Sequence, residues 1–236
     1  MSLVDRPEPG SPWISRWRTD VSAEGYSLNG YDKLRCIFVG IPKTASRSVM
    51  LSLFGNLGGG HTDIRRYRKV FGDEFDGYFK FTFVRNPWDR LVSAYFFLRK
   101  GGLTAADSSW SQTHLSGFAS FSSFIDGWVT PENVTTWRHF RPQHGYVCDV
   151  DGHFAVDYVG CFERLERDFR VVSQRLGIEA ELLHENRTDG RRADYRSYYT
   201  DAMAEAVGKV YARDVEVFGY QFDHAPPHAP RLGALE

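Results

Sequence analysis

The chain has 236 residues, of which 42% are hydrophobic and 25% charged, a composition typical of a globular protein. The net charge of -1 gives no global basis for binding nucleic acid, so any anion site must be local. No stretch is apolar for long enough to span a bilayer, and the amino terminus lacks the apolar core of a signal peptide.

The chain is predicted to hold one main domain over residues 34–222. Residues 1–33 are rich in Pro, Gly, Ser and Trp without periodicity, and we expect them to form an extended arm. Residues 223–236 are expected to be a disordered tail. The three cysteines, Cys36, Cys148 and Cys161, form no CxxC pair, so they are predicted to be buried thiols in a reducing compartment. The expected location is the cytoplasm.

The first half of the domain contains a strand, a turn and two helices. Residues 34–39 form a short apolar run, which predicts a buried strand. Apolar residues at helical spacing then predict a helix over about 46–57, which the glycines at 58–60 end. Thr62 or Asp63 is expected to cap a short basic helix over 64–70.

The rest of the chain continues this alternation. A strand is predicted over 78–84, followed by a helix with Pro87 at its first position. The Ser/Gly-rich stretch 101–117 is expected to be a loop that holds a lid or an acceptor-binding insert. A helix near 121–128, a strand over 156–162, a helix ending at Gly177 and a helix over about 201–218 follow. This alternation predicts an α/β fold whose mostly parallel central sheet is flanked by helices.

The first strand–helix junction carries groups suited to an anion. A helix N-terminus presents unsatisfied backbone N–H groups and the positive end of the helix dipole. Lys43 adds a positive charge, and Thr44, Ser46 and Ser48 add hydroxyl donors. The loop is not a Walker A motif, because GxxxxGK[ST] is absent. The alternative is that Lys43 is a solvated surface cation and Ser46 only the helix N-cap.

The second junction repeats this arrangement. Arg85 follows a predicted strand, where a guanidinium can bind two oxygens of a phosphate, and Ser93 comes about two helical turns later. The alternative is that Arg85 pairs with Asp89 and Ser93 packs against a neighbouring helix. Two such junctions together suit a ligand with phosphate-type groups at both ends.

Both junctions resemble motifs of sulfotransferases that use 3′-phosphoadenosine 5′-phosphosulfate (PAPS). IPKTASRS at 41–48 resembles their 5′-phosphosulfate loop, and FVRNPWDRLVSAY at 83–95 their 3′-phosphate motif. The similarity is closer to the carbohydrate branch, sulfotransferase family 2, which includes heparan sulfate 2-O-sulfotransferase and whose loop also reads PKTAS. It continues through RPQ at 141–143, VGCFERLERDF at 159–169, HENRT at 184–188 and YARDVEVFGY at 211–220, and so covers about residues 34–222.

The resemblance implies a P-loop-like three-layer α/β fold and a transfer step that needs no metal. It implies that Lys43 contacts the oxygen bridging sulfate and 5′-phosphate, and that Arg85 and Ser93 bind the 3′-phosphate. The loop residues implied to bind the donor are Lys43, Thr44, Ala45, Ser46, Arg47 and Ser48. Arg47 departs from the family pattern, since relatives usually carry Thr there. Arg187 matches a basic residue that returns to the nucleotide, with Arg191 and Arg192 as alternatives. The product would be 3′-phosphoadenosine 5′-phosphate.

The acceptor hydroxyl needs a base near neutral pH, and histidine is the usual choice. His61 follows the three glycines, at the place where related enzymes hold a base. His139 and His144, which flank RPQ, are alternatives, and each of the three could instead be a buried structural histidine.

The acceptor is expected to be a hydroxyl-bearing glycan or glycolipid, and the sequence leaves the oligomeric state open. The basic run Arg65, Arg66, Arg68 and Lys69 suits an anionic acceptor or is a solvated helix face. Trp110, Trp128 and Trp137 are expected either to stack on sugar rings or to pack in the core. The competing functions are a P-loop-like nucleotide-dependent kinase and a non-catalytic nucleotide- or glycan-binding module.

Overall fold

The computed structural model describes residues 17–183 and 194–223. Arg187, Arg191, Arg192 and the tail from residue 224 therefore lie outside the described residues. The described chain forms two compact units, residues 17–84 with 143–183 and residues 85–142 with 194–223. The first division falls between Val84 and Arg85, where the second predicted junction begins.

The first unit is built on a three-stranded parallel sheet. Its strands are β1 (Cys36–Val39), β2 (Phe79–Val84) and β3 (Tyr158–Cys161), in the order β1-β2-β3. The register aligns Phe38 with Phe81, and Phe81 with Tyr158. This confirms the predicted α/β fold with a parallel sheet between helices. Since the strands are parallel, β1 and β2 end at the same edge of the sheet.

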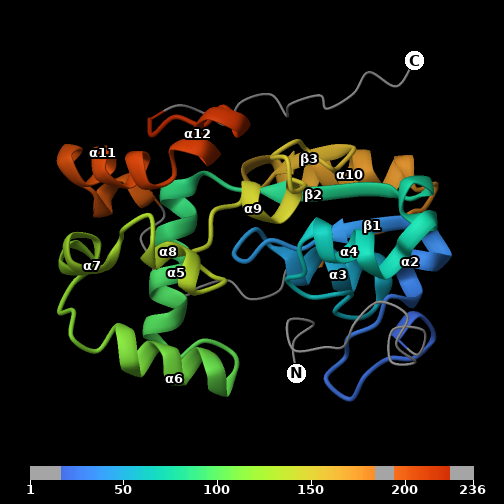
Figure 1. Cartoon of the computed structure of the whole chain (residues 1–236), viewed down its shortest axis with the longest axis horizontal. Coiled ribbons are helices and arrows are strands. Elements are labelled where there is room, and N and C mark those ends of the chain that lie inside the picture. Colours follow the sequence, from blue (N-terminus) through green and yellow to red (C-terminus); the bar gives the residue numbers. More distant parts are fainter. Residues whose placement is uncertain (1–16, 184–193, 224–236) are drawn as a thin grey trace. The chain divides into compact units, whose positions relative to one another are not determined.

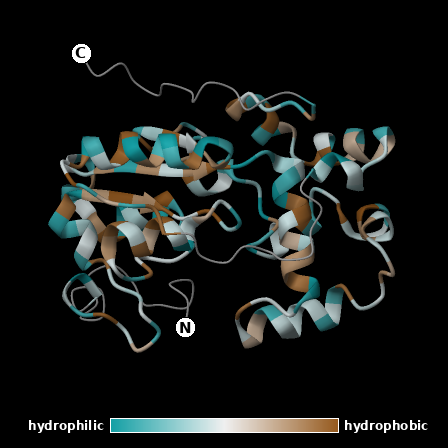
Figure 2. Cartoon of the chain, turned by 180° about the vertical axis from the view of Figure 1, so that it is seen from behind, coloured by the Kyte–Doolittle hydropathy of each residue, from teal (hydrophilic) through white to brown (hydrophobic). Residues whose placement is uncertain are grey.

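The strands form where the chain is apolar enough to be covered by helices. In Figure 2, hydrophobic residues, coloured brown, lie along the strands. Every residue of β1 is fully buried. The ring centroids of Phe38 and Phe81 lie 5.0 Å apart in a stacked arrangement. Lys80 is the charged residue inside β2, and its Nζ donates to the Tyr78 carbonyl at 2.7 Å and pairs with Asp157 at 3.1 Å. These two partners offset the cost of burying the ammonium group.

Helices flank this sheet. They are α2 (Asn29–Leu34), α3 (Ser46–Phe54), α4 (Ile64–Phe71), η2 (Gly72–Gly77), α9 (His144–Val147), η3 (Phe162–Arg164) and α10 (Leu165–Arg175). Helix α2 packs beside β1 and α10 beside β3 (Figure 1). Helix α2 begins inside the segment expected to be extended, because Leu28 and Tyr31 are fully buried and hold that segment on the core. The domain limits otherwise stay a prediction.

The described residues of the second unit form helices joined by loops. It contains α5 (Pro87–Arg99), α6 (Ala105–His114), α7 (Phe121–Trp128), α8 (Asn133–Thr136), η4 (Tyr195–Tyr198), α11 (Asp201–Val210) and α12 (Ala212–Phe218). Helix α5 packs against α6 and α11 (Figure 1). It also contacts η4. Trp110 and Trp128 are buried beside Phe140, with ring centroids 5.5 and 4.9 Å from its ring, so both pack in the core.

Two predicted elements of this unit differ from the structure. The stretch 101–117 is not a loop throughout, since α6 occupies its centre and the Thr104 side chain caps it by accepting from the Asp107 N–H at 3.1 Å. The last helix is broken at Tyr211, whose hydroxyl donates to the Phe140 carbonyl at 2.7 Å. At this break Tyr211 has φ −103° and ψ 24°, which depart from helical geometry.

The three cysteines are buried free thiols, as predicted. Within the described ranges, no helix is both long and apolar enough to cross a membrane. The cytoplasmic location stays a prediction.

Candidate functional site

The loop after β1 has an unusual backbone. Lys43 and Ala45 have φ angles of 71° and 61°, in the left-handed region that residues other than glycine rarely adopt. Between them Thr44 is fully buried, and its hydroxyl donates to the Ile41 carbonyl at 3.0 Å. Turns that contain residues with left-handed backbone angles can direct successive backbone N–H groups into one concavity, and such concavities bind anions. Backbone strain of this kind is typical of functional sites.

Helix α3 continues this anion-binding geometry. Its N-cap is Ala45, and no side chain caps the helix, so the alternative that Ser46 is only the N-cap is wrong. The first-turn N–H groups and the positive end of the helix dipole therefore lie at the end of the loop, where they favour an anion. Ser46 and Ser48 are buried in this first turn, Lys43 is half-buried and Arg47 is exposed.

His61 is attached to the start of the same loop. Its Nδ1 lies 2.8 Å from the Gly40 carbonyl oxygen, three residues before Lys43. A carbonyl can only accept, so Nδ1 carries the hydrogen and, in the neutral ring, Nε2 is the proton acceptor. Gly40 is required here, because a Cβ would lie 2.7 Å from the Gly60 carbonyl oxygen. This geometry suits a general base.

The two alternative histidines, His139 and His144, have surroundings that differ from those of His61. His139 belongs to the second unit, where it is buried and its Nε2 lies 3.0 Å from Asp107 Oδ1. Its ring also packs against Phe97, with centroids 4.9 Å apart. His144 is the first residue of the four-residue α9 and is half-buried. Of the three, His61 has the geometry that best suits a base.

The second junction lies at the start of α5. Arg85 Nε donates to Asp89 Oδ2 at 2.7 Å, and both side chains are buried, so the pairing considered as the alternative does form. Ser93 is also buried and follows Asp89 by four residues, which places the two on one helix face. The ion pair thus holds the guanidinium against the face that carries Ser93. A role in phosphate binding stays a prediction for both residues.

Two residues that support this junction were not predicted from the sequence. The Asn86 side chain accepts from the N–H groups of Trp88 and Asp89 and donates to the Gln221 carbonyl at 3.1 Å. Arg90, only 1% exposed, donates to the carbonyls of His139 and Arg141 at 3.3 and 2.9 Å. An Asn directly before a Pro at the first helical position was a usable capping signal. No sequence signal distinguished Arg90 from a surface arginine.

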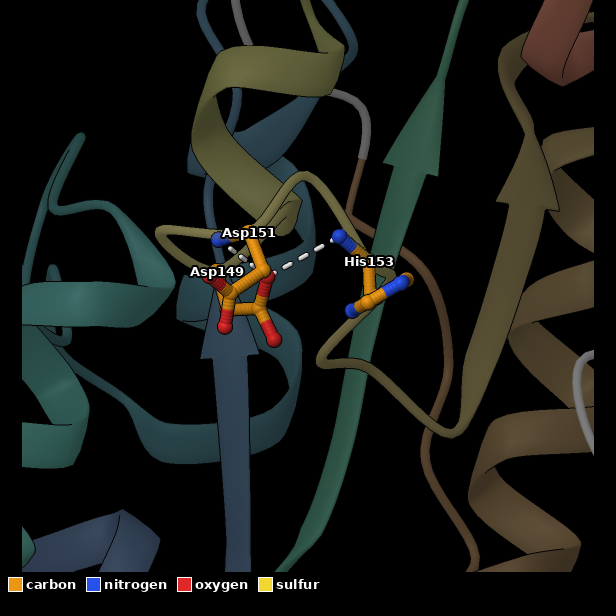
Figure 3. Close-up of side chains that lie close together, drawn as sticks. All are labelled: Asp149, Asp151 and His153. Carbon is orange, nitrogen blue, oxygen red and sulfur yellow. Dashed lines mark hydrogen bonds between the residues drawn. The ribbon is translucent and has the colours of Figure 1, made fainter.

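One further group offers metal-ligand atoms. Among the residues that the structure describes, Asp149, Asp151 and His153 place one ligand atom each within 4.8 Å of the others. Figure 3 shows Asp149 closing this turn, since its Oδ1 accepts from the N–H groups of Asp151 and His153 at 3.0 and 2.9 Å. These hydrogen bonds account for the arrangement without an ion. The predicted absence of a metal in the transfer step stays a prediction.

Comparison with known proteins gives the family. The model of the sulfotransferase family matches residues 31–221. The chain is 27% identical to carbohydrate sulfotransferase 12 of Mus musculus over 189 residues, which are 66% of this chain and 44% of the mouse protein. It is also 27% identical over 108 residues to an uncharacterized protein of Archaeoglobus fulgidus, covering 46% of this chain and 75% of the relative. No solved structure matches significantly. Because the family match spans most of its length, the chain belongs to the sulfotransferase family.

Proposed function

We propose that this protein transfers a sulfuryl group from PAPS to a hydroxyl group of a carbohydrate or glycolipid. Family membership supports sulfuryl transfer, and the name of the mouse relative favours a carbohydrate acceptor. One observation carries the proposal: His61 is hydrogen-bonded to Gly40, at the start of the loop in which Lys43 and Ala45 adopt positive φ. The candidate base, His61, and the candidate anion-binding loop around Lys43 therefore belong to the same compact unit.

Lys43 stabilises the leaving group in this proposal. The acceptor oxygen forms a bond to sulfur while the bond between sulfur and the bridging oxygen breaks, and that electron pair remains on the 5′-phosphate of the product. A positive charge at the bridging oxygen favours this step, because it acts where negative charge develops. The first-turn N–H groups of α3 and the hydroxyls of Thr44, Ser46 and Ser48 are the proposed ligands of the sulfate and the 5′-phosphate.

His61 accepts the acceptor's proton through Nε2. The hydrogen bond from Nδ1 to the Gly40 carbonyl supports this role, since it selects the tautomer in which Nε2 carries the lone pair. The same carbonyl stabilises the imidazolium formed when the proton arrives. His139 is less suited to this task, because it is buried and its ring packs against Phe97.

Arg85 and Ser93 are proposed to bind the 3′-phosphate that distinguishes PAPS from ATP. Asp89 orients the guanidinium through Nε, and an arginine has four further N–H bonds on its two Nη atoms. A carboxylate that orients an arginine through one edge is compatible with phosphate binding through another. Arg187 remains a predicted ligand of the nucleotide.

The test is sulfuryl transfer from PAPS to a panel of polysaccharides and glycolipids. Lys43→Ala and His61→Gln should each lower kcat by about a hundredfold or more, because each removes one of the proposed catalytic interactions. Matched controls are Lys209→Ala and His114→Gln, which change exposed residues of the second unit and should leave kcat unchanged. Full activity in both Lys43→Ala and His61→Gln would refute the mechanism. Magnesium-dependent turnover of ATP would instead support a kinase. Nucleotide binding without any group transfer would support a non-catalytic binding module.

A further inference from the structure

Two carbonyls at the end of β1 accept hydrogen bonds from side chains that lie outside the sheet. The Gly40 carbonyl accepts from His61, and the Phe38 carbonyl, two residues earlier, accepts from the hydroxyl of Tyr31 at 2.8 Å. Tyr31 belongs to α2 and is fully buried. Both side chains therefore attach a separate segment to the stretch of chain that leads into the Lys43 loop.

The hydrogen bonds of Tyr31 extend to the segment that carries His61. A tyrosine hydroxyl has one hydrogen, and Tyr31 gives it to Phe38, because a carbonyl can only accept. The Tyr31 oxygen can then act only as an acceptor toward its other neighbours. It accepts from the Gly59 N–H at 3.4 Å and from the hydroxyl of Tyr67 at the same distance. Gly59 is thus connected to β1 through Tyr31.

The turn from Gly58 to Gly60 is packed tightly against these hydroxyls. A Cβ at Gly58 would lie 2.7 Å from the Tyr31 hydroxyl, and one at Gly59 would collide with the Tyr67 hydroxyl. The Gly58 N–H donates to Asn56 Oδ1 at 2.7 Å, and the Gly59 carbonyl accepts from the Thr62 hydroxyl at 2.7 Å. The turn therefore has little room to shift, and its position depends on where the Tyr31 hydroxyl lies.

We propose that Tyr31 is a positioning residue for His61, because its hydroxyl links Gly59 to the Phe38 carbonyl and so holds the His61 ring on the Gly40 carbonyl. This inference rests on the proposed role of His61 as the base. Burial raises the pKa of Tyr31 well above its ordinary value, so the hydroxyl keeps its proton and remains the donor to Phe38. Tyr67 supports the arrangement by donating to Tyr31.

The test replaces one hydroxyl and follows both the tautomer of His61 and the kinetics. In the full-length protein, nitrogen NMR of the imidazole should show the Nδ1–H tautomer for His61, with the signal assigned by its loss in His61→Gln. Tyr31→Phe should give a mixture of the two tautomers and lower kcat by about tenfold, because small displacements of a catalytic group are costly. The KM for PAPS should change less than twofold, since the Lys43 loop is not altered.

Tyr211→Phe is the matched control. Tyr211 is also buried, and its hydroxyl also donates to a backbone carbonyl, that of Phe140 in the second unit. This variant should lose stability to a similar degree without changing the tautomer or kcat. Equal effects of the two variants on kcat would overturn the inference, because general destabilisation would then explain both. If Tyr31→Phe fails to fold, Tyr67→Phe should shift the tautomer in the same direction but less.

The outcomes separate this inference from the proposed function. An unchanged tautomer and kcat in Tyr31→Phe, together with an inactive His61→Gln, would overturn the positioning role and keep the base. A shifted tautomer in Tyr31→Phe, together with a fully active His61→Gln, would keep the link from Tyr31 to His61 and refute His61 as the base. A fall in PAPS affinity that matches the fall in kcat would assign Tyr31 to the donor loop instead.

Discussion

A single buried carboxylate, Asp107, connects three parts of the second unit. It is 2% exposed, and its oxygens accept from His139 Nε2 at 3.0 Å, from Arg138 at 2.9 Å and from the Leu103 N–H at 3.4 Å. Burial alone would raise the pKa of Asp107, but the hydrogen bonds and charges of His139 and Arg138 outweigh it and hold the pKa well below its usual range. The residue therefore contributes to stability as a carboxylate.

Asp107→Asn should lower the free energy of unfolding by about 3 kcal/mol at pH 7, because buried His139 and half-buried Arg138 lose their charged partner. A group whose pKa is lowered by folding adds stability above its unfolded pKa, about 3.9, and loses it as the pH falls toward the folded pKa. The difference between wild type and variant should accordingly shrink below about pH 4. Urea unfolding at pH 7 and pH 3 measures it. An equal stability difference at pH 7 and pH 3 would contradict a stabilising role for the Asp107 carboxylate. The control is Asp126→Asn, which changes an exposed residue and should change stability by less than about 0.5 kcal/mol.

At the scale of elements, the sequence predicted helices best where apolar spacing and caps agreed. The helix 121–128 and the start of α5 at Pro87 were confirmed. Helix α6 was missed because Gly and Ser around it suggested a loop, although Thr104-Ala-Ala-Asp107 is a capping signature. Its buried residues, Asp107 and Trp110, are three apart but include a charge, which hides the apolar period. Tertiary packing, such as that of Trp110 on Phe140, adds to the local capping signal in such elements.

The contribution of the α6 cap to stability can be measured by comparing Thr104, the N-cap, with Thr113, which lies within the helix. Thr104→Ala should lower the free energy of unfolding by about 1 kcal/mol, because the Asp107 N–H loses its side-chain acceptor. Thr113→Ala should be neutral or slightly stabilising, since exposed Thr113 only donates to the Ser109 carbonyl within the helix and alanine is the better helix former. Chemical unfolding of both variants compares them. A loss at Thr113 equal to that at Thr104 would exclude capping as the cause.

At the scale of the whole molecule, both strand–helix junctions could be recognised in the sequence, but their detailed geometry could not. A strand, a short loop with Lys43 and a helix can be recognised in the sequence, because each has a local pattern. The positive φ angles of Lys43 and Ala45 carry no such pattern, since glycine is the residue that usually marks them. The bond between His61 and Gly40 joins residues 21 apart, and it depends on how the glycine turn packs beside β1. The links from Tyr31 and Arg90 to distant carbonyls are tertiary for the same reason.

The product of the proposed donor carries a 3′-phosphate that AMP lacks. If Arg85 binds this 3′-phosphate, wild type should prefer 3′-phosphoadenosine 5′-phosphate to AMP, and Arg85→Ala should remove this preference while leaving AMP affinity unchanged. Lys43→Ala should weaken both nucleotides. Each lost charged contact should cost about tenfold or more in affinity. Calorimetric titration measures these values, with exposed Arg213→Ala as the control. Equal binding of both nucleotides by wild type would refute recognition of the 3′-phosphate, because the second junction would then contribute nothing to the donor site.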